Sequence, residues 1–157
     1  MNPVTPAEIG RISLFDALPE DELAGLAGAT VRKRLDDGDT LFEQGQPAGT
    51  LHVVISGGLI LRAEAERRSV IVDTLQPGDL VGWSAMRGGA ITLSTARAVG
   101  PTEVLAIPVD PIVALAAGGS KHAEMLVRRI VALAAGHLEA SWKQLLQVGR
   151  EGVISAG

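Results

Sequence analysis

The sequence contains no cysteine, and this absence excludes disulfide frameworks, thiolate zinc sites and cysteine nucleophiles. Aromatic residues make up only 3% of the chain, so the hydrophobic core must consist mainly of aliphatic side chains. No uninterrupted apolar run is long enough to span a membrane, and the first ten residues lack the basic and apolar regions of a secretory signal. We therefore expect a cytoplasmic protein with no membrane partner.

The chain also lacks an excess of basic residues. Its 14 Lys and Arg against 18 Asp and Glu give a net charge of −4, whereas a nucleic-acid binder normally carries a basic excess. The pairs Arg67-Arg68 and Arg128-Arg129 are too small to form a nucleic-acid footprint. Only residues 149–157 follow the last predicted helix, which is too short for a helix-turn-helix domain. We therefore expect no nucleic-acid partner.

The 157 residues, of which 46% are hydrophobic, suit one folded domain that spans residues 1–157. Residues 5–29 and 110–148 repeat apolar side chains at the three- and four-residue spacing of helices. Residues 30–108 instead form short β-branched runs between glycine, proline and aspartate, a pattern typical of strands. The predicted strands are residues 30–35, 40–42, 51–56, 59–65, 69–75, 92–99 and 102–107. The sequence thus predicts a mainly β fold, an antiparallel jelly roll with N-terminal helices and a long C-terminal helix.

Local signals predict where several elements begin and end. The run Ser56-Gly57-Gly58 predicts a hairpin between the third and fourth strands, because glycine adopts positive φ without steric cost. Asp110 and Ser120 are the predicted N-caps of two C-terminal helices, and Gly118-Gly119 is predicted to end the first of them. The last residues, 149–157, are expected to fray.

Three segments, Asp37–Gly45, Leu51–Gly57 and Leu75–Gly82, space their glycines in a characteristic order. The glycines concerned are Gly38, Gly45, Gly57, Gly78 and Gly82. In this spacing the chain resembles the cyclic-nucleotide-binding domain family, which includes the catabolite activator protein and the regulatory subunit of the cAMP-dependent kinase. The resemblance covers residues 14–146. It implies a non-catalytic regulatory or sensor module and a cyclic nucleotide or another anionic small molecule as ligand.

The family holds its ligand with a phosphate-binding cassette, which corresponds to residues 82–98 here. In the family, backbone N–H groups at a helix start and an arginine bind the phosphate, and an acidic residue accepts a hydrogen bond from the ribose. The resemblance implies the following candidate ligand-binding residues: Gly82, Trp83, Ser84, Ala85, Arg87, Thr92, Leu93 and Ser94.

Two positions of this cassette depart from the family pattern. Trp83 stands where the acidic residue should be, and Thr92 stands where the arginine should be. An indole has no hydrogen-bond acceptor and a threonine has no charge, so we expect cAMP and cGMP to bind weakly or not at all. Arg87 and Arg97 are the nearest cations that could replace the arginine, but the ordinary interpretation, which we prefer, gives neither a binding role and places Arg97 as a solvent-facing strand residue.

Two other function classes remain as alternatives. The first is a structural or protein-interaction module that has lost nucleotide binding, with Trp83 filling the vacated pocket. The second is a metal-binding enzyme of the cupin type, because cupins are also jelly rolls. Such a site needs clustered ligands, whereas His52, His122 and His137 are widely spaced. The sequence therefore predicts no metal site, no certain cofactor and no enzymatic activity.

The long C-terminal helix is apolar over more than one face. The residues concerned are Met125, Leu126, Val127, Ile130, Val131, Leu133, Leu138, Trp142 and Leu145. A stripe of this breadth is typical of a helix with two partners. Gly136 costs about 1 kcal/mol relative to alanine in mid-helix, and with Ala132 and Ala135 it would let a second helix approach. We therefore expect a homodimer through this helix, with a different protein partner as the alternative.

Overall fold

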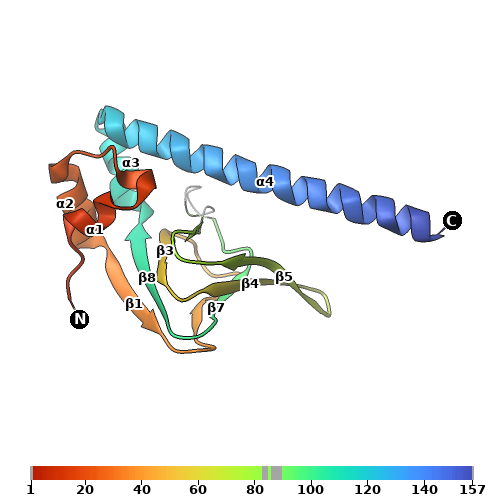
Figure 1. Ribbon diagram of the computed structural model, residues 1–157. Helices are drawn as coiled ribbons and strands as arrows, with labels where there is room; N and C mark the ends of the chain where they lie inside the picture. The colour runs from red at the N-terminus through yellow and green to blue at the C-terminus, as the bar shows by residue number, and fades with distance from the viewer. Residues whose placement is uncertain (1, 83–84, 86–89, 157) are drawn as a thin grey trace.

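The computed structural model describes residues 2–82, 85 and 90–156, and helices precede and follow the strands along the chain (Figure 1). The N-terminal part holds α1 (Pro6–Gly10), the 3-10 helix η1 (Ser13–Phe15) and α2 (Glu20–Ala29). The strands are β1 (Val31–Leu35), β2 (Thr40–Phe42), β3 (Thr50–Ser56), β4 (Leu59–Ala65), β5 (Arg68–Leu75), β6 (Leu80–Val81), β7 (Thr95–Ala98) and β8 (Thr102–Pro108). The C-terminal part holds α3 (Val109–Ala117) and α4 (Lys121–Ala156). No helix in the described part of the chain is long and apolar enough to cross a membrane.

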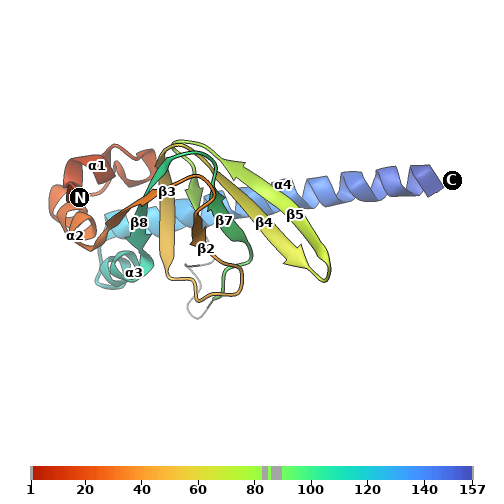
Figure 2. The same cartoon turned by 90° about the horizontal axis from the view of Figure 1, so that it is seen from below.

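The strands form two four-stranded sheets whose strand pairs are all antiparallel. One sheet has the order β1-β8-β3-β6 and the other has the order β2-β7-β4-β5. The two sheets make a β-roll, with the N-terminal helices and α3 gathered at one end and α4 running alongside (Figure 2). The predicted fold class, a mainly β roll with flanking helices, is confirmed.

The core has two apolar layers that meet at β3. Leu51 and Val53 face the helices, where they pack in one cluster with Phe15, while Val54 faces the space between the sheets. Because successive side chains of a strand point to opposite faces, His52 shares the inner face with Val54. Apart from Phe15, the largest fully buried side chains are aliphatic, as the sequence predicts.

The predicted hairpin at Ser56-Gly57-Gly58 is wrong, because this turn carries the chain from one sheet to the other. β3 pairs with β6 and β8, whereas β4 pairs with β5 and β7. The turn is sharp because Gly57 has φ 80° and lies against the backbone of Pro101 and Thr102. The hydroxyl of Thr102 also accepts a hydrogen bond from the N–H of Gly58 (3.2 Å). The hairpin of this region instead joins β4 to β5, where Ala65 pairs with Arg68.

The C-terminal helices begin differently from each other. Ser120 caps α4 as predicted, since its hydroxyl accepts from the N–H of Ala123 (3.1 Å). The predicted cap at Asp110 is wrong, because α3 already begins at Val109, whose N–H donates to the carbonyl oxygen of Gly49 (3.0 Å). Asp110 lies within the first turn instead, where its charge favours the helix dipole. Gly118 follows the last residue of α3, as predicted.

Helix α4 is longer than the sequence predicts. The expected end near Val148 and the expected frayed tail are wrong, because the helix continues to Ala156. Glycine keeps its backbone N–H, so Gly149 and Gly152 continue the hydrogen-bond ladder at a cost of about 1 kcal/mol each. At 1.5 Å per residue, the 36 residues span about 54 Å. The C-terminal part of α4 therefore reaches beyond the tip of the β4–β5 hairpin in both views (Figures 1 and 2).

Candidate functional site

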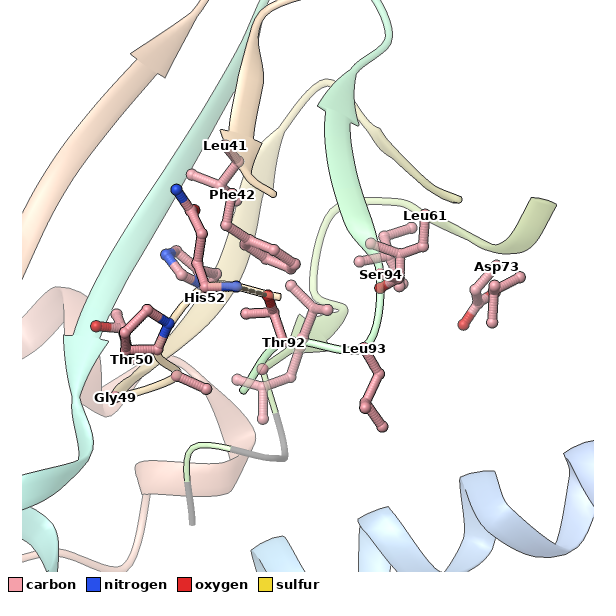
Figure 3. Close-up of a pocket in the computed structure, with 18 of the residues that line it drawn as sticks. Leu41, Phe42, Gly49, Thr50, His52, Leu61, Asp73, Thr92, Leu93 and Ser94 are labelled. Atoms are coloured by element: carbon pink, nitrogen blue, oxygen red, sulfur yellow. Dashed lines mark hydrogen bonds between the residues drawn. The ribbon is translucent and has the colours of Figure 1, made fainter. Parts of the chain in front are cut away.

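A cavity of about 510 Å³ lies between the two sheets and opens toward α4 (Figure 3). Its walls come from both sheets, with Leu41 and Leu61 on one side and His52 and Val81 on the other. Ala134 of α4 lines the cavity as well. The volume is within the range of small-molecule pockets, roughly 300–1,000 Å³, so a nucleotide-sized ligand would fit.

Four of the candidate residues from the sequence line this cavity: Gly82, Thr92, Leu93 and Ser94. Gly82 has φ 101°, and a Cβ at this position would lie 2.5 Å from the carbonyl oxygen of Thr50, so only glycine fits. Ala85 is buried in the core cluster on the helix side, and its N–H donates to the carbonyl oxygen of Gly82 (2.9 Å). The candidates Trp83, Ser84 and Arg87 lie outside the described residues.

Thr92, which stands in the place of the expected arginine, forms hydrogen bonds with the turn at residues 43–46. Its hydroxyl donates to the carbonyl oxygen of Glu43 (2.5 Å) and accepts from the N–H of Gln46 (3.1 Å). Its backbone N–H and carbonyl oxygen bond to Gln46 and Gly45 (2.8 and 2.9 Å). A hydroxyl has one proton, and here that proton is donated to the protein. Thr92 therefore holds the turn at residues 43–46 and has no hydroxyl proton left for an anion.

Arg97 does not replace the missing cation, because it points away from the cavity. On β7, Ala96 and Ala98 are buried between the sheets, whereas Arg97 is exposed on the opposite face. The interpretation of Arg97 as a solvent-facing strand residue is confirmed. The ionisable side chains among the described lining residues are Lys33, His52 and Asp73, and none of these residues is an arginine.

His52 is the cavity residue whose role the sequence analysis missed. The residue is only 6% exposed, its Nδ1 atom has no hydrogen-bond partner in the part of the chain that the structure describes, and its ring lies 5.5 Å from that of Phe42. Burial and, to a smaller extent, the positive charge of Lys33 together lower the pKa of His52 to about 4, so the imidazole is neutral near pH 7. The sequence feature that could have indicated this role is a single polar residue inside the apolar run Leu51–Ile55. From the sequence, His52 was considered only as a metal ligand. No group of three or more His, Asp or Glu residues in the described part of the chain could hold a metal ion.

Comparison with known proteins agrees with this architecture. The profile of the cyclic nucleotide-binding domain family matches residues 32–118, which is more than half of the chain. No curated protein sequence matches.

Many solved structures are similar to the chain, among them the following three. A cyclic nucleotide-binding domain from Methylobacillus flagellatus KT is 17% identical, with a TM-score of 0.76 over 90% of this chain and 83% of that one. The catabolite activator protein of Thermus thermophilus is 25% identical, with a TM-score of 0.68 over 87% of this chain and 62% of that one. The regulatory domain of Toxoplasma gondii PKA, solved with cAMP, is 16% identical, with a TM-score of 0.66 over 81% of this chain and 48% of that one.

This chain therefore spans about half to two thirds of the last two proteins. At identities below 25%, as for the first and third structures, the likeness establishes the fold alone. The family assignment rests instead on the profile match, which covers β1 to α3 and includes the cavity between the sheets. On this evidence, the chain belongs to the cyclic nucleotide-binding domain family.

Proposed function

We propose that this chain is a non-catalytic regulatory module whose cavity between the sheets senses a small molecule, and that cAMP and cGMP are not that molecule. The observation that carries the proposal is the engagement of Thr92, whose hydroxyl proton is donated to Glu43 where the family places a charged arginine. Trp83 supports it from the sequence, since an indole cannot accept a hydrogen bond from ribose. The cavity itself is retained, so a different ligand can use the same architecture.

Isothermal titration calorimetry with cAMP and cGMP tests this proposal. Loss of a charged partner typically costs about 3–5 kcal/mol, or roughly a 10²- to 10⁴-fold loss of affinity. We therefore expect the natural chain to show no saturable binding of cAMP or cGMP at ligand concentrations below about 0.1 mM. Low-micromolar cAMP binding would contradict the proposal, and would indicate that Arg87 supplies the missing charge.

Two substitutions at Thr92 test whether a charge at this position limits the binding of cAMP. Thr92→Arg restores the charge and should tighten cAMP binding at least tenfold, whereas Thr92→Gln lengthens the side chain without a charge and should not. Equal cAMP affinities of the two variants would show that charge at residue 92 does not limit binding. A thermal-shift screen over cyclic mono- and dinucleotides then searches for the ligand, because a molecule that binds only the folded state raises Tm.

A second candidate function is association through α4, and the exposure of this helix favours it. Leu126 and Ile130 are buried against the domain, whereas Met125, Val131 and Leu133 are about half exposed. Small exposed positions accompany them at Ala132, Ala135 and Gly136, and a Cβ at Gly136 would meet open space. For Leu138, Trp142 and Leu145 the structure describes the helical backbone and not the side chains. Because two-fold pairing is the commonest homo-oligomer symmetry, we propose that two copies pair along this part of α4.

Sedimentation equilibrium at micromolar concentration measures this association. We expect a species of twice the 16.3 kDa chain mass for the natural protein. Val131→Glu places a carboxylate on the exposed apolar stripe and should shift the equilibrium toward monomer by at least tenfold. Gln147→Glu adds the same charge at an exposed position of α4 that lies 16 residues beyond Val131, past the part of the helix proposed to pair, and should leave the dimer intact. A natural protein that sediments as a monomer, or a dimer that Val131→Glu does not weaken, would refute the pairing.

A further inference from the structure

The cavity holds a buried hydrogen-bonding group, on His52, for which the described residues supply no partner. We propose that His52 orients the ligand of this cavity, and that the ligand is an uncharged, planar heteroaromatic ring with a hydrogen-bonding group at its edge. This inference rests on the proposed function, namely that the cavity takes a small molecule. It adds the chemical class of that molecule and the residue that selects it.

The position of His52 supports a role in binding. The residue lies on the inner face of β3, next to the interior position of Val54, and its side chain lines the cavity. Its Nδ1 atom is buried, and no atom of residues 2–82, 85 or 90–156 forms a hydrogen bond with it. An unpaired buried polar atom costs about 1–3 kcal/mol, so a ligand group that pairs with Nδ1 removes a cost that the empty cavity carries.

The walls around His52 suit a flat apolar body. The ring of Phe42 lies 5.5 Å from the imidazole with an interplanar angle of 34°. Leu41 and Leu61 add aliphatic surface to the walls of the same cavity (Figure 3). Aromatic faces and aliphatic walls favour a ring that buries its faces, and the single polar atom then fixes how the ring is turned.

The charges along the cavity wall argue against an anion. Lys33 and Asp73 are the charged residues among the described lining, and they have opposite signs. Asp73 lies across the cavity from His52 (Figure 3), and His52 itself is neutral near pH 7. Thr92 has already donated its hydroxyl proton. An anionic ligand would thus lie near a carboxylate, and the described wall would offer it no net positive charge. The anion would also lose its hydration on entering the cavity, a cost that an uncharged ring does not have.

Adenosine and cAMP form a matched pair of probes, because they share the same ring and differ in the cyclic phosphate. We expect calorimetry on the full chain to show adenosine, guanosine or cytidine binding, with cAMP no tighter than adenosine. His52→Leu keeps the site apolar and should weaken the best of these probes at least tenfold. His52→Gln keeps a neutral hydrogen-bonding group at this position and should retain most of the affinity.

The ¹⁵N resonances of the imidazole provide a readout that does not depend on a variant. The chain has only three histidines, so the His52 signals are assigned by their loss in His52→Gln. We expect the Nδ1 resonance of His52 to shift on addition of the bound nucleoside, while the His122 resonances stay in place. An unshifted Nδ1 resonance, or equal affinities of the natural chain and His52→Leu, would overturn the role of His52.

The screen also separates failure of this inference from failure of the proposed function. If the nucleosides do not bind but an anionic compound of the thermal-shift screen does, the ligand class inferred here is wrong and the sensing function stands. If no compound in either set binds, both are wrong. Binding of cAMP at least tenfold tighter than adenosine would overturn the uncharged ligand class and the exclusion of cAMP together.

Discussion

Replacing Gly57 by alanine is expected to destabilise the fold by about 2–5 kcal/mol. A left-handed conformation costs a residue with a Cβ roughly 1–2 kcal/mol, and overpacking adds typically 1–3 kcal/mol. Gly57 has φ 80°, and its added Cβ would lie 2.3 Å from the carbonyl oxygen of Pro101 and 2.5 Å from Oγ1 of Thr102. The close oxygen of Pro101 belongs to the backbone, so relief requires the two sheets to shift where the chain crosses between them.

Gly38 provides the matched control for this substitution. Its φ is 84°, nearly that of Gly57, but a Cβ there would meet open space. Gly38→Ala should therefore show the conformational cost alone, about 1–2 kcal/mol. Thermal unfolding compares them, because 1 kcal/mol lowers Tm by roughly 2–4 °C for a domain of this size. Equal losses of Tm in the two variants would mean that the contacts of Gly57 with Pro101 and Thr102 relax without cost.

The order of helices and strands was predictable because glycine marks most corners of the roll. Gly38, Gly45, Gly57, Gly78 and Gly82, whose spacing carried the family resemblance, all have positive φ. Local signals did not reveal which strands pair, because the same positive φ serves a hairpin and a crossing between sheets. The turn at Gly57 was misassigned for this reason. The two-residue strand β6 was missed because it is too short to show an alternating pattern.

The candidate site was only partly predictable. Gly82, Thr92, Leu93 and Ser94 were expected at the ligand position and do line the cavity. The engagement of Thr92 by Glu43 and Gln46 depends on a turn nearly fifty residues away in the sequence. His52 was missed for a similar reason. The burial of a side chain between two sheets depends on how those sheets pack, and this packing cannot be deduced from the run Leu51–Ile55 alone.

The same burial predicts that acid destabilises this protein through His52. The pKa of His52 is lowered from 6.5 to about 4 in the folded state, chiefly by desolvation and then by the charge of Lys33. Between these values the unfolded chain binds more protons than the folded one, so stability falls as pH falls. The contribution of His52 is complete above pH 6.5 and is lost as the pH approaches 4. Asp73 is the one acidic residue among the described residues of the cavity wall, and it lies across the cavity from His52 (Figure 3).

Denaturant unfolding of the natural chain and of His52→Gln, from pH 7.5 down to pH 4, isolates this contribution. One pKa unit corresponds to about 1.4 kcal/mol, so the natural chain should lose about 2 kcal/mol more than the variant by pH 5, and about 3 kcal/mol more by pH 4. Carboxylates contribute to both proteins and cancel in the difference. One of them is Glu8, whose pKa is lowered by a hydrogen bond from the Thr5 backbone and by the Arg32 side chain. Stability curves that run parallel over this pH range would show that His52 titrates alike in the folded and unfolded chains, and that the cavity wall is more hydrated than its burial indicates.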